Sequence, residues 1–293
     1  MSKKAALVLS GGGARGMAHI GVIEELERRN YEIVSVTGTS MGSVVGAVYA
    51  MGKLEEFKAW LYSLDKLKVF RLMDFTLSKQ GLLKGEKVLN KMKELMEDRN
   101  IEDLDIPYAA VAVDLLNKRE VVFREGKVYD AIRASIAIPG ILTPVKTNKT
   151  LLVDGGVMDN VPVKHVQRHA DELIIAVEVN GDIRMEKEPA TKEAQEDQRF
   201  FLQKQLGGLY EYLGIKGQPK SEEKLGYLDL INRTISLMTH EMGLLSLEKY
   251  PPDILIEVSG EGCGIFDFYK AKEIVERGIR AAERVLKEQE ISY

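Results

Sequence analysis

The chain alternates short apolar runs with longer segments whose apolar residues recur at helical spacing. Apolar runs at 4–10 and 33–37 are each followed by a helix-like segment, at 17–30 and 43–51. Near-continuous apolar runs of this length are typical of strands that are buried on both faces of a parallel sheet. The N-terminal part of the chain therefore predicts two parallel strands, each followed by a helix that packs on the sheet.

The same two patterns continue to the end of the chain. They predict further helices at 53–64, 85–98, 128–135, 225–249 and 269–289, and further strands at 107–113, 119–124, 151–153, 173–179 and 254–258. Strands that alternate with helices indicate an α/β fold. We expect a central, mostly parallel sheet with helices on both faces.

The sequence changes character in its C-terminal third, where a strongly charged segment precedes the apolar, glycine-containing residues 200–217. The strand and helix patterns of the core resume only after this region. We therefore expect one domain over residues 1–293, with a core formed by 1–182 and 251–293 and a helical insertion at about 184–249.

Composition and charge narrow the class of protein. Of the 293 residues, 45% are hydrophobic and 29% are charged, as in an ordinary globular protein. The chain has 41 Lys and Arg and 45 Asp and Glu, which gives a formal net charge of -4. This charge argues against nucleic acid as the main partner. Cys263 is the only cysteine, which excludes an intrachain disulfide and fits a reducing compartment. No uninterrupted apolar stretch approaches the ~18 residues that cross a bilayer. We expect a cytoplasmic protein that can touch a membrane surface peripherally.

The second apolar run ends in Gly38-Thr39-Ser40-Met41-Gly42, and a helix-like segment of small residues follows. This spacing matches Gly-x-Ser-x-Gly, in which a serine at a sharp strand-to-helix turn projects its hydroxyl above the sheet. Gly38 and Gly42 lack the Cβ atoms that would collide with the neighbouring strand and helix. A serine hydroxyl is a weak nucleophile and needs a neighbouring base. The motif predicts Ser40 as a nucleophile.

The first apolar run ends in the glycine-rich loop Gly11–Gly16. The loop formally matches the dinucleotide fingerprint, but the second strand ends in the serine motif and not in an acidic residue, which disfavours NAD. The Gly-Lys-Ser/Thr of a Walker phosphate loop is absent. Consecutive glycines at a helix N-terminus favour an oxyanion hole made of backbone N–H groups. Arg15 either adds a fixed charge to this hole or ties the loop down.

Two kinds of base for the serine stay open. Asp154 ends an apolar strand and precedes Gly155-Gly156. This position places a carboxylate at the carboxyl edge of a sheet, where open α/β folds build their sites, although Asp before Gly is equally common in an Asx-type turn. His165 and His169 follow Asp154 in the order of a Ser-Asp-His triad.

The glycine loop, the serine motif and Asp154-Gly155-Gly156 together resemble the motifs of the patatin-like phospholipase family. Further similar segments are Ala131-Ile132-Arg133-Ala134-Ser135, Ile138-Pro139-Gly140, Thr143-Pro144 and Asp159-Asn160-Val161-Pro162-Val163. The resemblance covers roughly Lys4 to Val179. It implies a three-layer αβα fold.

The resemblance also implies roles for individual residues. Ser40 is the nucleophile and Asp154 its only partner, a dyad without histidine. The oxyanion hole consists of Gly11, Gly12 and Gly13 with Arg15. The glycines that support the motifs are Gly16, Gly38, Gly42, Gly155 and Gly156. No metal and no cofactor are implied. An ordinary Asp pKa lies near ~3.9, so we expect a desolvated Asp154 and an oxyanion hole that carries much of the catalysis.

The implied reaction is hydrolysis of acyl esters, most naturally of phospholipids or lysophospholipids, through an acyl-enzyme. Residues 200–215 then have two interpretations: an acyl trough, lid or lipid-contacting surface, and ordinary packing in a core or dimer interface. Two alternative functions use the same motifs. One is an acyltransferase or thioesterase that forms the same acyl-enzyme, and the other is a regulatory binding protein on the same fold. The sequence predicts no oligomeric state.

Overall fold

The computed structural model describes residues 2–76, 81–183 and 227–291. The chain divides into two compact units, Met1–Ile183 with Asn232–Tyr293, and Arg184–Ile231. The first unit contains the sheet and the three motifs. The apolar segment 200–217, with its two interpretations, lies outside the described residues.

A mixed sheet forms the centre of the first unit, in the order β10-β9-β1-β2-β4-β8-β7 with β5 paired to β4. The parallel strands are β1 (Lys3–Leu9), β2 (Tyr31–Thr39), β4 (Tyr108–Asp114), β9 (Leu173–Gly181) and β10 (Ile254–Ser259). The antiparallel ones are β5 (Arg119–Phe123), β7 (Val145–Lys146) and β8 (Leu151–Asp154). The predicted mostly parallel sheet is confirmed. A separate two-stranded parallel sheet pairs β3 (Gly81–Leu83) with β6 (Gly140–Leu142).

The helices follow the predicted segments closely. They are α1 (Ala18–Arg28), α2 (Met41–Ala50), α3 (Leu54–Tyr62), α4 (Lys66–Leu72), α5 (Glu86–Leu95), α6 (Val128–Ser135), α8 (Tyr227–Lys249) and α9 (Ala271–Ile291). The pattern did not predict α4, a short helix that Asp65 caps by accepting the Lys68 N–H at 2.8 Å. Short elements with few buried residues leave little periodic signal.

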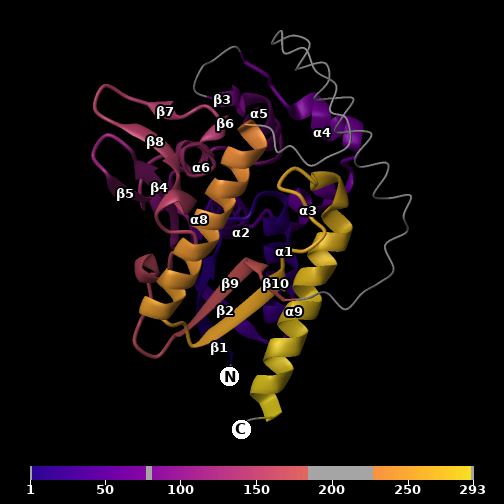
Figure 1. The fold of residues 1–293 in the computed structure, drawn as a ribbon. Helices are drawn as coiled ribbons and strands as arrows, with labels where there is room; N and C mark the ends of the chain where they lie inside the picture. Colours follow the sequence, from indigo (N-terminus) through magenta and orange to yellow (C-terminus); the bar gives the residue numbers. More distant parts are fainter. Residues whose placement is uncertain (1, 77–80, 184–226, 292–293) are drawn as a thin grey trace. The chain divides into compact units, whose positions relative to one another are not determined.

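Side chains of β1 alternate between two cores, one on each face of the sheet. Leu7 and Leu9 pack with α1, α2 and α9, whereas Val8 packs with Val161, Val163 and the end of α8. Figure 1 accordingly shows α8 on one side of the sheet and α1 and α2 on the other. Because β1 is buried on both faces, its sequence is a continuous apolar run, and the three-layer architecture is confirmed.

The end of α8 is fastened to the core, which changes one expected boundary. The Ser246 hydroxyl donates to the Val161 carbonyl at 2.7 Å and lies 3.1 Å from Asp159 Oδ1. Residues 232–249 therefore belong to the first unit, although the sequence pattern assigned them to the insertion. Helical periodicity shows that a segment has an apolar face but not which core that face joins. The description of 1–293 as one domain with an insertion stays a prediction.

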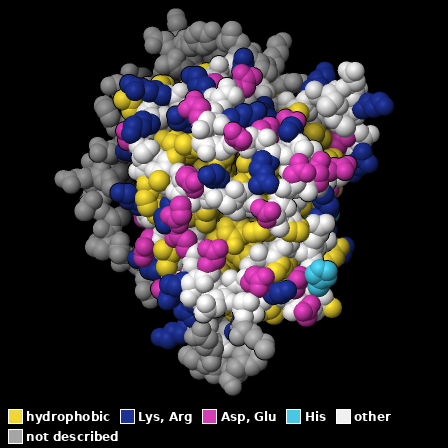
Figure 2. Space-filling model, turned by 180° about the vertical axis from the view of Figure 1, so that it is seen from behind, with side chains coloured by type: hydrophobic (Ala, Val, Ile, Leu, Met, Phe, Trp, Pro, Cys, Tyr) yellow, Lys and Arg dark blue, Asp and Glu magenta, His cyan; other side chains and the backbone are white. Residues whose placement is uncertain are grey.

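The surface carries charges of both signs. Figure 2 shows Lys and Arg interspersed with Asp and Glu, with hydrophobic side chains between them, over the face behind the view of Figure 1. This mixture differs from the basic stripe of a nucleic-acid-binding protein. Among the helices of the described residues, none is both long and apolar enough to cross a bilayer.

Two glycines let α1 and α9 pack at very short range. A Cβ on Gly278 would lie 2.0 Å from the Ala18 carbonyl oxygen, and a Cβ on Gly21 would lie 2.1 Å from the Val275 carbonyl oxygen. Both contacts are with backbone, which cannot rotate away. The spacing of these helices over the sheet, and the position of the glycine loop that precedes α1, therefore depend on both glycines.

Gly278→Ala is expected to lower the free energy of unfolding by about 1–3 kcal/mol, because the added methyl group must push α9 away from α1. Urea unfolding followed by circular dichroism measures this change. Arg280→Ala, at an exposed position of the same helix, is the matched control and should change the free energy by less than about 0.5 kcal/mol. Equal stability of the Gly278 variant and the control would contradict the close helix contact.

Candidate active site

Ser40 lies at the turn between β2 and α2 in a strained conformation. Its φ of 53° and ψ of -123° are unusual for a residue with a side chain. A Cβ on Gly38 would lie 2.4 Å from the Gly42 carbonyl oxygen, and a Cβ on Gly42 would lie 2.2 Å from the Leu9 carbonyl oxygen. The Ser40 N–H donates to Ser135 Oγ at 2.9 Å. The Gly-x-Ser-x-Gly segment thus forms the sharp strand-to-helix turn that its spacing predicted, and the role of Ser40 as a nucleophile stays a prediction.

Asp154 reaches Ser40 through the pairing of β4. Val111 of β4 pairs with Thr39 at the end of β2, and the next residue, Ala112, pairs with Asp154 at the end of β8. The sequence placed Asp154 at the carboxyl edge of the sheet, and it does lie beside the carboxyl end of β2, although β8 itself runs antiparallel to β4. Asp154 meets the serine because β8 ends at the level where β2 ends.

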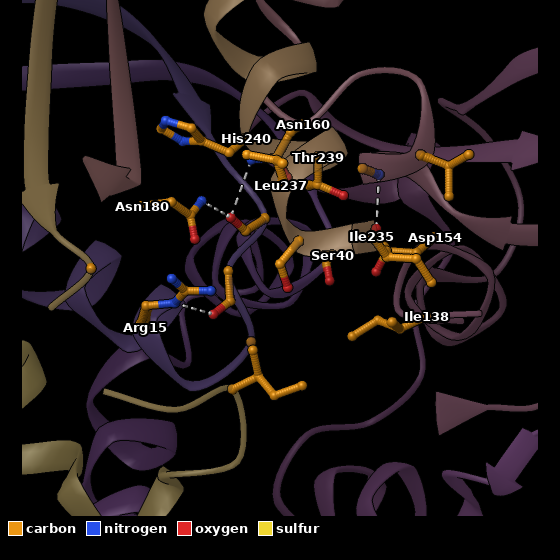
Figure 3. Close-up of a pocket in the computed structure, with 18 of the residues that line it drawn as sticks. Arg15, Ser40, Ile138, Asp154, Asn160, Asn180, Ile235, Leu237, Thr239 and His240 are labelled. Carbon is orange, nitrogen blue, oxygen red and sulfur yellow. Dashed lines mark hydrogen bonds between the residues drawn. The ribbon is translucent and has the colours of Figure 1, made fainter. Parts of the chain in front are cut away.

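The Asp154 carboxyl group is buried and only half satisfied. Asp154 is 6% exposed, and its Oδ1 atom accepts the Gly156 N–H at 2.8 Å. Oδ2 has no hydrogen-bond partner within the described residues. Figure 3 shows Asp154 beside Ser40 in the pocket. Burial raises the pKa of Asp154 to about 6, although the Ser40 hydroxyl and the Gly156 N–H both act to lower it. Asp154 therefore makes an Asx-type turn through Oδ1 and keeps Oδ2 beside the serine.

The glycine loop is held through its carbonyl groups. The Gly11 carbonyl accepts Asn180 Nδ2 at 2.8 Å and Asn160 Nδ2 at 3.4 Å, and the Gly12 carbonyl accepts Arg15 Nε at 3.3 Å. In a planar trans peptide the N–H points away from the C=O of the same unit. The three side chains therefore direct the N–H groups of Gly12 and Gly13 to the other side, where no hydrogen bond of the described residues takes them.

Gly11 has a different part from the other two glycines. Its N–H already donates to the Asn160 carbonyl at 3.1 Å. A Cβ at this position would lie 2.6 Å from Asn160 Oδ1 and 3.1 Å from Ser40 Cβ. Gly11 thus gives the loop room beside the serine, and its N–H is not available to a ligand.

A buried acid supports Asn180. Glu178 Oε1 accepts the Asn180 backbone N–H at 2.7 Å and is also bonded to Asn180 Nδ2. Burial raises the pKa of Glu178 to about 7, against the lowering effect of Asn180 and of the Arg15 charge. Sequence analysis did not single out Asn180 or Glu178. The sequence could have pointed to them by their place at the end of the apolar run 173–179. This run forms β9, which pairs with β1.

The glycine loop, Ser40, Asp154, Asn160 and Asn180 line one cavity of about 570 Å³. Of the predicted site residues, it brings together Gly11, Gly12, Gly13, Arg15, Ser40, Asp154 and Gly156. The other motif glycines, Gly16, Gly38, Gly42 and Gly155, lie outside the lining and allow close backbone approach. Gly16, for example, faces Met41, whose Cγ would lie 2.4 Å from an added Cβ.

The histidines take no position between the serine and the aspartate. His165 is bound to Glu120 at 2.6 Å, and neither His165 nor His169 lines the serine cavity. His19 is fully buried with Nε2 2.8 Å from the Ser10 carbonyl, and burial lowers its pKa to about 4. His240 of α8 does line the cavity, and Figure 3 shows it beside Asn180 and Asn160, across Ser40 from Asp154.

One group of possible metal ligands occurs among the described residues. Glu120, Asp159 and His165 offer ligand atoms within 4.8 Å of one another. The Lys164 ammonium lies 2.7 Å from Glu120 and 3.6 Å from Asp159. A lysine cation thus already occupies the position next to these carboxylates, which makes them an ion-pair cluster.

Comparison with known proteins identifies the family. The model of the patatin-like phospholipase family matches residues 7–166.

The chain belongs to the patatin-like phospholipase family. An uncharacterized NTE family protein of Mycobacterium bovis is 33% identical over 99% of this chain and 93% of its own length. A lysophospholipase NTE1 of Candida glabrata is 26% identical over 93% of this chain and 15% of its own length. The solved structure of VipD from Legionella pneumophila covers 97% of this chain and 67% of its own, with 13% identity and a TM-score of 0.44. Membership of the patatin-like phospholipases implies lipid acyl hydrolase activity.

The buried charge of Asp154 generates a prediction about stability. The folded state holds a proton on Asp154 up to about pH 6, whereas the unfolded chain releases it near 3.8. The wild type therefore loses stability as the pH rises between these two values. Asp154→Asn does not titrate and should be more stable than the wild type at pH 8, by roughly 1–3 kcal/mol, with little difference at pH 3.5.

Chemical denaturation at several pH values measures this difference. Asp105→Asn, at an exposed position, is the matched control and should follow the wild type throughout. A variant that is less stable at pH 8 than the wild type would mean that the Asp154 carboxylate is stabilised, not penalised, by its surroundings.

Proposed function

We propose that this chain is a serine acyl hydrolase that cleaves carboxylic esters of lipids with Ser40 and Asp154. The observation that carries the proposal is the strained serine beside a buried carboxylate oxygen that has no other partner among the described residues. The membership of the family supports the same reaction class. Phospholipids or lysophospholipids are the proposed substrates, and the lysophospholipase relative supports this choice by its name.

In the first half of the proposed reaction, Ser40 Oγ attacks the ester carbonyl carbon while Asp154 accepts the hydroxyl proton. The tetrahedral intermediate collapses, the bond to the alcohol oxygen breaks, and Asp154 returns the proton to the leaving alcohol. In the second half, a water molecule attacks the acyl-enzyme by the same route, and the products are a carboxylic acid and free Ser40.

The environment of Asp154 makes it a better base than a free aspartate. Proton transfer is most efficient when the pKa of the base lies near the working pH. Burial moves the pKa of Asp154 from 3.8 to about 6, toward that range. The carboxylate is still mostly ionised at pH 7, so it can accept a proton without first losing one. The expected desolvation of Asp154 thus supports a dyad.

We assign the oxyanion hole to the N–H groups of Gly12 and Gly13, with Met41, the first residue of α2, as a third donor. The Gly12 and Gly13 groups are oriented by the side chains that hold the loop carbonyls. Met41 follows the nucleophile directly, the usual place for such a donor. Gly11, the third expected donor, does not take part, because its N–H already donates to the Asn160 carbonyl. Its missing side chain leaves room beside Ser40. Arg15 ties the loop down.

Ser40→Ala and Asp154→Asn should each reduce ester hydrolysis by at least about a thousandfold, because they remove the nucleophile and the base. Turnover of a chromogenic ester and labelling by a fluorophosphonate measure the loss, and circular dichroism checks folding. His240→Ala is the matched control within the same cavity and should stay within about tenfold of the wild type.

Loss of activity in the His240 variant together with full activity in Asp154→Asn would overturn the dyad. Turnover that requires an added alcohol would assign the chain to acyl transfer, and an absence of any Ser40-dependent turnover would assign it to regulatory binding.

Asn180→Asp tests the loop. The substitution keeps the side-chain shape but removes the amide donor to the Gly11 carbonyl. We expect kcat to fall by about 10- to 100-fold with little change in KM, because a misdirected N–H weakens binding of the transition state more than that of the substrate. Asn90→Asp, at an exposed position of α5, is the isosteric control. A rise in KM alone, with unchanged kcat, would place Asn180 in substrate binding instead.

A further inference from the structure

A second cavity, of about 160 Å³, also reaches Ser40. Its walls come from α2, α3, α4 and α5 and are almost entirely aliphatic and aromatic, with Val44, Phe57, Leu61 and Met92 among them. The carboxylate in this lining, Asp74, is already engaged, because it accepts the N–H groups of Gly85 and Glu86, each at 2.7 Å. The cavity thus offers an apolar ligand contact surface and few groups that would attract water.

The two cavities meet at the nucleophile. Both are bordered by Gly13, Ser40, Ile138, Ile141 and Ile265. Their remaining linings differ in chemistry. The larger cavity combines polar side chains, namely Arg15, Asn180, Asp182, His240 and Glu241, with apolar ones such as Val157, Ile235 and Leu237. An ester whose carbonyl carbon lies at Ser40 Oγ extends in two directions, the acyl chain and the alcohol, and an apolar cavity and a cavity of mixed polarity both reach that point.

We propose that the small apolar cavity binds the acyl chain and that the larger cavity, which holds the polar and charged side chains, binds the leaving alcohol and admits the hydrolytic water. This inference rests on the proposed function and adds the orientation of the substrate. The difference in volume implies a substrate class: an ester with one acyl chain in the apolar cavity and a bulky polar alcohol, such as a glycerophosphoryl headgroup, in the other. The apolar segment 200–217 is then not required for the acyl chain.

The residues that line the apolar cavity should limit the length of the acyl chain that it can bind. Val44 lies one helical turn beyond Ser40 on α2 and is 4% exposed. Leu61 belongs to α3, is 3% exposed and is borne by a different helix from the nucleophile. A larger side chain at either position should therefore shorten the acyl chain that fits.

A series of p-nitrophenyl esters from acetate to palmitate tests the wild type first. Each methylene that enters the cavity should raise kcat/KM about fourfold, until the cavity is full and the increase stops. Acetate needs no apolar cavity, so its Ser40-dependent hydrolysis tests the proposed function alone. Absence of that hydrolysis would sink the proposed function, whereas acetate hydrolysis without any rise along the series would sink only the acyl-chain assignment.

Substitutions in the two cavities then show which cavity binds the acyl chain. Val44→Phe and Leu61→Phe should each keep acetate hydrolysis and lower activity on long-chain esters at least tenfold. Ile235→Phe makes the same kind of change in the larger cavity and should leave the preferred chain length unchanged while altering the preference for the alcohol.

The opposite pattern, in which Ile235→Phe shortens the preferred chain and Val44→Phe does not, would reverse the proposed orientation. If Val44→Phe loses acetate hydrolysis through misfolding, Leu61→Phe decides between the two results. Unfolding temperatures of all three variants identify that case.

Discussion

The candidate site depends on the pairing of two successive residues of β4. Val111 pairs with the end of β2 and Ala112 with the end of β8. Through this pairing, two strands that run in opposite directions deliver a serine and an aspartate to one level of the sheet. Ser135 adds to the arrangement, because its hydroxyl donates to the Val111 carbonyl at 2.7 Å and accepts the Ser40 N–H. A shift of β8 by one residue would turn the Asp154 side chain to the other face.

The surroundings of that pair hold groups that are unfavourable in the fold and useful in the proposed reaction. Asp154 is buried with one oxygen unpartnered among the described residues, Ser40 has a positive φ, and Glu178 is buried beside the glycine loop. Each feature lowers stability by an amount that close packing elsewhere must offset. The contact of α1 with α9 at Gly21 and Gly278 is one such place. The unfavourable groups of the site thus lie in a scaffold in which α1 and α9 pack so closely that only glycine fits between their backbones.

The sequence predicted the fold well where elements are long and buried. The apolar runs 4–10 and 173–179 became β1 and β9, and the helix at 128–135 has the same bounds in the structure. It missed α4, because short elements carry little periodicity, and it made no prediction about the direction of β8, because strand direction depends on a distant partner. In the site, the motifs identified Ser40, Asp154 and the glycine loop, but Asn160 and Asn180 act on that loop from positions 149 and 169 residues away.

The sequence by itself determined the alternation of strands and helices, the glycines at the two turns, and the residue types that can act as nucleophile, base and oxyanion donors. These properties are local, because they follow from the spacing of apolar residues and from the steric needs of single turns. Only the tertiary structure decided which N–H groups of the loop are free, how far burial raises the pKa of Asp154, and that an apolar cavity and a cavity of mixed polarity meet at Ser40. Those properties depend on which distant segments surround each group, and no local pattern records that.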